Sequence, residues 1–219
     1  MIFDMSPSLP ADVKPSWRGW LHAGAAPVVL VAGLMLILLA PGTTARLTTA
    51  IYTGTGVLLF GTSALYHLVN WQPPAKLLLK RFDHSNIMLV IAGSYTPLSA
   101  LMLPRSTATV LLWLIWTGAV LGVLFRVLWV GAPRWLYVPL YVLLGITALF
   151  FLPQFWAAGA VPTLLICLGG VFYISGAVIY GVKRPNFSVR HFGFHELFHA
   201  LTVAGFASHF VAVALVLFG

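Results

Sequence analysis

Long apolar runs constrain this chain more than any other feature of its sequence. A bilayer core requires about 20 apolar residues per helix. Seven runs reach that length, at 20–40, 48–70, 84–103, 108–129, 135–153, 159–181 and 192–217. Only 7% of the residues are charged, whereas soluble domains average about 25%, so an ordinary water-soluble surface is excluded. The sequence therefore predicts an all-α membrane protein, a bundle of seven transmembrane helices.

Proline and glycine residues separate these runs and leave no room for a soluble domain. Pro41-Gly42 follows the first run, Pro73-Pro74 the second, and Pro185 precedes the last, as expected of residues that interrupt helices. The first run has no cleavage signature, so we interpret it as retained. We expect a short cytoplasmic tail at residues 1–19 and a single membrane domain at residues 20–219.

Lysine and arginine residues predict the orientation of the bundle. Counted over alternate loops, ten lie on one side and two, Arg46 and Arg105, on the other. The ten are Lys14, Arg18, Lys76, Lys80, Arg81, Arg126, Arg134, Lys183, Arg184 and Arg190. Because positive charge is retained in the cytoplasm, the N-terminus is expected inside and the C-terminus outside. Topology thus accounts for the net charge of +8, and we expect no nucleic-acid partner.

Three distant segments bring titratable residues to one depth. The second predicted helix carries His67 near its inner end, the third begins with Asp83 and His84, and the seventh has His195 and His199 in its first turns. At 1.5 Å per residue, all of them lie within roughly 5–15 Å of the cytoplasmic boundary. Ionisable residues inside a membrane are costly and by default indicate a functional site.

The histidines of this group predict a zinc site. His195 and His199 are four residues apart, so both rings project from one helix face and can hold one ion. With His67 they supply three imidazoles, a ligand set that leaves the fourth zinc position open for chemistry. We predict that His67, His195 and His199 bind Zn2+. The alternative is that these histidines only form hydrogen bonds between helices.

Asp83 and Ser63 are the candidate catalytic residues. An ionised Asp83 would balance the charge of the metal and act as general base on its water. The alternatives for Asp83 are an N-cap at the start of the third helix or an ion pair with Arg81. Ser63 lies four residues before His67 and can hydrogen-bond the water, an acyl carbonyl or Asp83. A bond from Ser63 to its own backbone is the alternative.

The segment HELFH at 195–199 fits the H-E-x-x-H pattern of zinc proteases, in which the glutamate is the general base. Here Glu196 is rotated by about 100° from His195, and we expect it at the interface, paired with a loop lysine or arginine. The other histidines are expected outside the ligand set: His22 and His84 in interfacial packing or beside the ligands, His191 near the interface, and His209 roughly 15 Å beyond His199.

These residues fall in stretches that resemble the haemolysin III family, the bacterial branch of the progestin and adipoQ receptor superfamily. The stretches are RGWLH (18–22), SALYH (63–67), RFDHSNIMLVIAGSYTP (81–97) and HELFHALTVAGFASHF (195–210). The resemblance implies seven helices with the N-terminus inside and zinc near the cytoplasmic face. It also implies that His67, His195 and His199 bind the zinc and that Asp83 holds the zinc-bound water. Ser63 corresponds to the serine of the family's S-x-x-x-H motif.

The resemblance further implies a location in the bacterial inner membrane, with membrane lipids as partners and a lipid substrate or free fatty acid as ligand. Eukaryotic relatives look like ceramidases, and bacterial members are linked to membrane homeostasis. Our leading hypothesis is a zinc-dependent hydrolase of lipid amides or esters. The alternative is a non-catalytic lipid sensor with structural zinc. A pore-forming haemolysin and an intramembrane metalloprotease fit less well, and the oligomeric state stays open.

Overall fold

The computed structural model describes residues 15–188 and 190–219. Most of the tail expected at residues 1–19, including Lys14, therefore lies outside the described residues. The described residues form helices and no strand longer than an isolated bridge between Ser188 and Phe192. The helices are α1 (Trp20–Leu39), α2 (Gly42–Leu68), α3 (Pro73–Met102), α4 (Arg105–Leu128), α5 (Arg134–Ile146), the 3-10 helix η1 (Thr147–Phe151), α6 (Leu152–Ala158), α7 (Ala160–Val182) and α8 (Phe194–Phe218).

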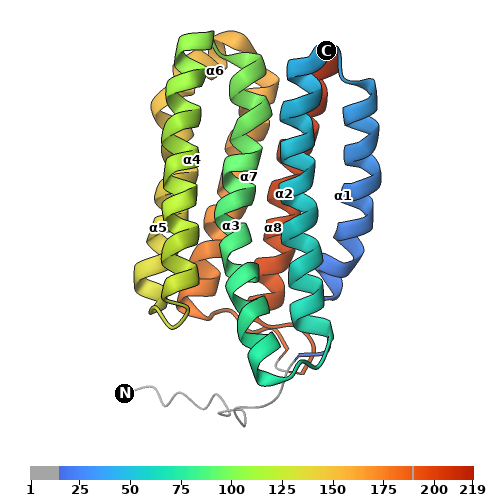
Figure 1. The fold of residues 1–219 in the computed structure, drawn as a ribbon, viewed down its shortest axis with the longest axis vertical. Helices are drawn as coiled ribbons and strands as arrows, with labels where there is room; N and C mark the ends of the chain where they lie inside the picture. Colours follow the sequence, from blue (N-terminus) through green and yellow to red (C-terminus); the bar gives the residue numbers. More distant parts are fainter. Residues whose placement is uncertain (1–14, 189) are drawn as a thin grey trace.

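The helices run side by side along one axis, with α8 behind α2 and α3 (Figure 1). Among the described residues, six helical segments are long and apolar enough to cross a membrane: α1, α3, α4, α5 through α6, α7 and α8. The chain is therefore an all-helical, multi-pass membrane protein. The seventh expected span, α2, is also long but less apolar. Its buried face includes polar residues such as Thr49 and Thr53, which contact protein rather than lipid.

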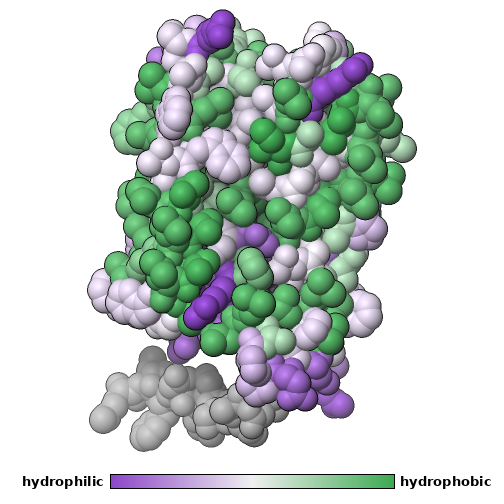
Figure 2. All heavy atoms as spheres, viewed as in Figure 1, coloured by the Kyte–Doolittle hydropathy of each residue, from purple (hydrophilic) through white to green (hydrophobic). Residues whose placement is uncertain are grey.

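The outer surface of the bundle is apolar. Large hydrophobic side chains such as Leu38, Trp113, Leu128 and Phe150 are each at least 73% exposed. Figure 2 shows hydrophobic residues over most of one face, with most hydrophilic side chains toward its two ends. A soluble monomer rarely exposes so large an apolar area, so this surface is suited to a lipid environment.

Helix α3 begins earlier than the apolar pattern predicts, and this changes the position of Asp83. The expected start was residue 84, but the helix starts at Pro73, which occupies a first-turn position where the missing N–H does no harm. The segment 76–81, in which three leucines lie between Lys76 and the pair Lys80 and Arg81, continues the helix. Asp83 consequently lies inside α3, so the N-cap alternative is wrong. Arg81 makes no ion pair with it within the described residues.

The fifth expected span is interrupted. Between α5 and α6 the backbone adopts the 3-10 form of η1, just before Pro153, which lacks the N–H that would continue an α-helical ladder. The side chain of Tyr95 on α3 satisfies backbone groups at this break. Its hydroxyl donates to the Gly145 carbonyl at 2.7 Å and accepts from the Ala148 N–H at 2.7 Å. Such compensation is needed where water is excluded.

The segment before α1 is bound to the segment before α8. The Ser16 N–H donates to the Arg190 carbonyl at 3.0 Å, and the Trp17 N–H donates to the His191 carbonyl at 3.3 Å. These bonds place the start of α1 against the start of α8. Residues separated by more than 170 positions therefore meet at the end of the bundle that holds the candidate site.

Candidate metal centre

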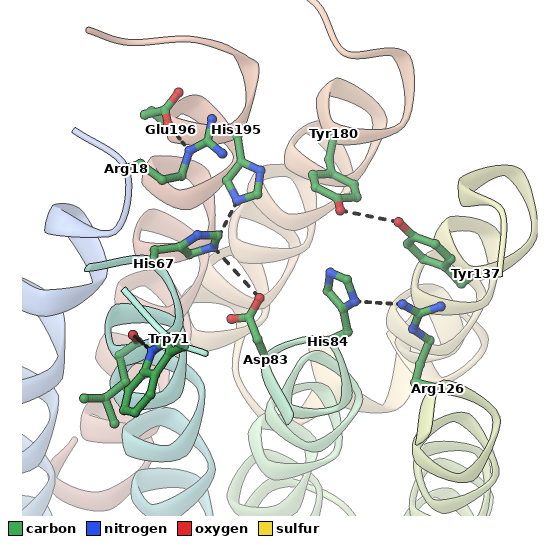
Figure 3. Close-up of polar contacts among 11 residues, drawn as sticks. Arg18, His67, Trp71, Asp83, His84, Arg126, Tyr137, Tyr180, His195 and Glu196 are labelled. Atoms are coloured by element: carbon green, nitrogen blue, oxygen red, sulfur yellow. Dashed lines mark hydrogen bonds and ion pairs between the residues drawn. The ribbon is translucent and has the colours of Figure 1, made fainter. Parts of the chain in front are cut away.

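Three histidine side chains from α2 and α8 converge. His67 comes from the last turn of α2, and His195 and His199 come from the first turns of α8. Their nearest ring nitrogens all lie within 4.8 Å of one another, and the Nε2 atoms of His67 and His195 are 3.3 Å apart (Figure 3). Two nitrogens bound at tetrahedral zinc are separated by about 3.3 Å. The predicted ligand set is therefore brought together, and it fits a metal ion.

Asp83 and Ser63 lie beside this histidine group. The Oδ2 atom of Asp83 is 4.0 Å from the Nε2 atom of His67, and the Asp83 side chain is only 12% exposed. Ser63, which is buried one turn before His67 on α2, is within hydrogen-bonding reach of the Asp83 carboxylate. Asp83 is not one of the three residues whose ligand atoms cluster. Its position suits a partner of a water molecule or of a ligand.

His22 lies beside this centre. It is buried on α1, and its ring stacks on that of His199 with centroids 3.8 Å apart and planes 7° from parallel. The backbone of His199 is near, yet neither ring nitrogen of His22 makes a hydrogen bond of normal geometry within the described part of the chain. Of the two positions expected for His22, the structure shows the one beside the candidate ligands. No sequence pattern indicates this contact, because it depends on how α1 packs on α8.

The stacking of His22 on His199 leads to a testable expectation. His22→Ala removes the ring that holds the His199 imidazole in place, and we expect metal affinity to fall by roughly tenfold, as for other outer-shell losses. His22→Phe retains a flat ring and should lose less. Competition with a fluorescent zinc chelator measures both variants. Equal losses in His22→Phe and His22→Ala would contradict a role through stacking.

Glu196 faces a different set of groups. Its carboxylate forms an ion pair with Arg18 and accepts the Gly193 N–H at 2.8 Å, which caps α8. The expected pairing with an arginine is confirmed, but Glu196 is fully buried rather than interfacial. With both carboxylate oxygens engaged, Glu196 is poorly placed to act as the base of a zinc protease. The H-E-x-x-H match is coincidental.

A glycine allows the start of α1 to pack closely against His67. Gly19 has a φ of 90°, and a Cβ atom there would lie 2.7 Å from the Cβ of His67. That distance is too short for any side chain, and the positive φ also disfavours one. The backbone of Gly19 therefore packs directly against the metal-ligand candidate His67.

The other histidines lie apart from the ligand set. Arg126 donates to the Nδ1 atom of His84 at 2.7 Å, so His84 is engaged outside the cluster. His191 is exposed and hydrogen-bonded to Ser16 at 2.9 Å. His209 is buried and donates to the Ile166 carbonyl at 3.1 Å. The expectation that His191 and His209 do not share the metal is in accord with the cluster found.

An apolar cavity of about 300 Å³ extends from the histidine group into the bundle. Its polar end is formed by His22, Ser63, Asp83, His195 and His199, and its walls are mainly hydrophobic side chains of α3, α5, α7 and α8. A hydrophobic wall with a few convergent polar groups at one end is typical of a ligand site. The centre thus lies at the polar end of a pocket suited to an aliphatic chain.

Comparison with known proteins agrees with the sequence motifs. The family model described as "Haemolysin-III related" matches residues 12–210. A protein named "Hemolysin-3 homolog" from Bacillus subtilis (strain 168) is 30% identical over 159 residues, covering 72% of this chain and 71% of the relative. "Hemolysin-3" of Bacillus cereus is 28% identical over 157 residues, covering 71% and 68%. This chain belongs to the haemolysin-III-related family.

Proposed function

We propose that this protein is a zinc-dependent hydrolase of lipid amides or esters that acts in membrane lipid homeostasis. The observation that carries the proposal is that His195, His199, Asp83 and Ser63 line one end of an apolar cavity, where His195 and His199 cluster with His67. His67, His195 and His199 would hold the metal. When bound, zinc would act as a Lewis acid on the scissile carbonyl and make water a stronger acid.

The roles of the protein groups follow from their positions. Asp83, with its carboxylate 4.0 Å from a ligand imidazole, accepts a proton from the attacking water. Ser63 orients that carboxylate or donates a hydrogen bond to the carbonyl oxygen as negative charge develops. The apolar cavity holds the acyl chain. The hydrophobic walls of this cavity also suit a free fatty acid as the product.

The membrane topology is part of this proposal. With α2 as a span, the chain crosses the membrane seven times, the N-terminus is cytoplasmic and the C-terminus outside. The division of Lys and Arg between alternate loops supports this orientation. The matched proteins from Bacillus support a bacterial cytoplasmic membrane. The histidine centre would then lie near the cytoplasmic face.

Asp83→Ala tests the reaction directly. We expect the variant to retain bound metal while its turnover of a fluorescent acyl amide or ester in detergent falls by about 10²–10⁴-fold, the usual contribution of a general base. Ser63→Ala should show a smaller loss. Arg105→Ala, at an exposed position at the start of α4, is the control and should have wild-type activity. Full turnover in Asp83→Ala would contradict the assignment of the base.

The alternative is a lipid sensor in which the metal is structural and connects α2 to α8. In that case the wild type hydrolyses none of the amides or esters, and metal removal lowers the unfolding temperature without a catalytic defect. The relatives' name, Hemolysin-3, adds one further measurement. Leakage of dye from liposomes at low protein density would favour a pore over both other functions.

A further inference from the structure

A second cavity, which we call the vestibule, lies next to the histidine centre. It has a volume of about 610 Å³ and, unlike the apolar cavity, is lined mainly by polar residues. Five cationic side chains line it: Arg18, Lys76, Lys80, Arg126 and Arg134. Among the described residues that line it, Asp83 is the single acidic one. This excess of positive charge calls for a physical explanation.

Arg126 is the most unusual of these cations. It is 1% exposed, and its guanidinium lies 4.2 Å from the centre of the Tyr137 ring. It donates to His84 at 2.7 Å and makes long bonds of 3.4 Å to the Trp129 and Val130 carbonyls. Its Nε has no hydrogen-bond partner among the described residues, and no carboxylate there pairs with it. A buried charge without a counter-ion is strongly unfavourable.

The neighbouring cations increase this imbalance. Lys80 on α3 and Arg134 on α5 line the same cavity as His84, the imidazole to which Arg126 donates. Arg134 lies over the Tyr180 ring at 4.5 Å and donates to the Tyr180 carbonyl at 3.1 Å. No acidic residue in the described part of the chain pairs with it. In contrast, the charge of Arg18 is neutralised by Glu196 (Figure 3).

The vestibule and the apolar cavity meet at the histidine centre. Asp83, His84, Tyr137, Tyr180 and His195 line both. A molecule with an aliphatic chain in the apolar cavity would therefore place its head group in the vestibule, with the metal centre between the two. An anionic head is the one that Arg126, Arg134 and Lys80 would accept, because guanidinium groups bind phosphate through paired, charge-assisted hydrogen bonds.

We infer that the vestibule binds a phosphate group, held by Arg126, Arg134 and Lys80, and that an anionic lipid supplies it. The adjoining apolar cavity favours a lipid over a free phosphate compound, because only a lipid would occupy both spaces. Binding as such does not require turnover. Only the further step, that the bound lipid is the substrate, rests on the proposed hydrolase function.

The test measures binding of three probes to the purified full-length protein by native mass spectrometry and isothermal titration: dioctanoyl phosphatidylglycerol, dioctanoyl phosphatidylcholine and inorganic phosphate. We expect the anionic lipid to bind in a saturable manner and more tightly than the zwitterionic lipid. Arg126→Gln should weaken its binding about tenfold or more, the effect of one charge-assisted hydrogen bond. Raising the salt concentration should weaken it further in the wild type.

Two further variants keep the test decisive if Arg126→Gln does not fold. Lys80→Gln changes a half-buried side chain of the vestibule and should weaken binding of the anionic lipid in the same direction. Arg105→Gln is the matched control, because it removes a cation from the opposite end of α4, and it should bind like the wild type.

The outcomes separate the two sources of phosphate. Binding of the anionic lipid that falls in Arg126→Gln and Lys80→Gln but not in Arg105→Gln supports the proposal. Binding of inorganic phosphate alone, with the same dependence, would overturn the lipid source. Equal affinity of all variants for every probe would overturn the anion site. Because no readout is turnover, a protein that binds the lipid but hydrolyses nothing would contradict only the proposed reaction.

Discussion

Replacing any one of His67, His195 and His199 with alanine is expected to remove the metal from the purified protein. The ligand atoms of these residues lie within 4.8 Å of one another, so each substitution takes one of three imidazoles from the same ion. The loss of affinity should exceed the roughly 10–100-fold that follows removal of an outer-shell partner. Elemental analysis should find about one zinc per chain in the wild type and little in each variant.

A matched control lies on the same helix. His209 on α8 is also buried, but it donates to the Ile166 carbonyl and is not part of the ligand group. His209→Ala should therefore retain the metal, even if the protein becomes less stable. Wild-type protein without stoichiometric metal, together with histidine variants of unchanged stability, would contradict the metal centre. The histidines would then be polar contacts between helices.

Removing the guanidinium of Arg18 is expected to destabilise the fold strongly. Glu196 is fully buried and forms its ion pair with Arg18, so Arg18→Ala leaves a buried carboxylate without a counter-charge. Breaking a buried ion pair in this way costs about 3–5 kcal/mol. Denaturant unfolding in detergent, followed by circular dichroism, measures the change. Because His195 immediately precedes Glu196, the variant should also bind metal less tightly.

Two further substitutions test whether the loss of stability in Arg18→Ala comes from the broken ion pair. Glu196→Gln keeps an acceptor for the Gly193 N–H at the start of α8 and leaves no buried anion, so we expect it to destabilise less than Arg18→Ala. Arg105→Ala, at an exposed site, should change the free energy of unfolding by no more than about 0.5 kcal/mol. An Arg18→Ala variant as stable as Arg105→Ala would show that the ion pair contributes nothing.

Local patterns predicted the helices and the histidine group that could hold a metal. Apolar runs of about 20 residues predict spans because the bilayer has a fixed thickness, and the observed helices overlap all seven runs. The four-residue spacing of His195 and His199 places both rings on one helix face, which follows from helix geometry alone. His67 could be added because alternating topology places the end of one helix beside the start of another. The length of a span and the spacing of its residues follow from a single helix, and the depth of a residue follows once the topology is known.

Only the tertiary structure decided which faces of the helices pack against one another. The stacking of His22 on His199, the ion pair of Arg18 with Glu196 and the unpaired charge of Arg126 all depend on the rotation and neighbours of each helix. The apolar pattern also placed the start of α3 too late, at residue 84 rather than Pro73. The reason is that a helix can continue through charged residues beyond its apolar run. Contacts between helices are set by packing of the whole bundle, and no short stretch of sequence encodes them.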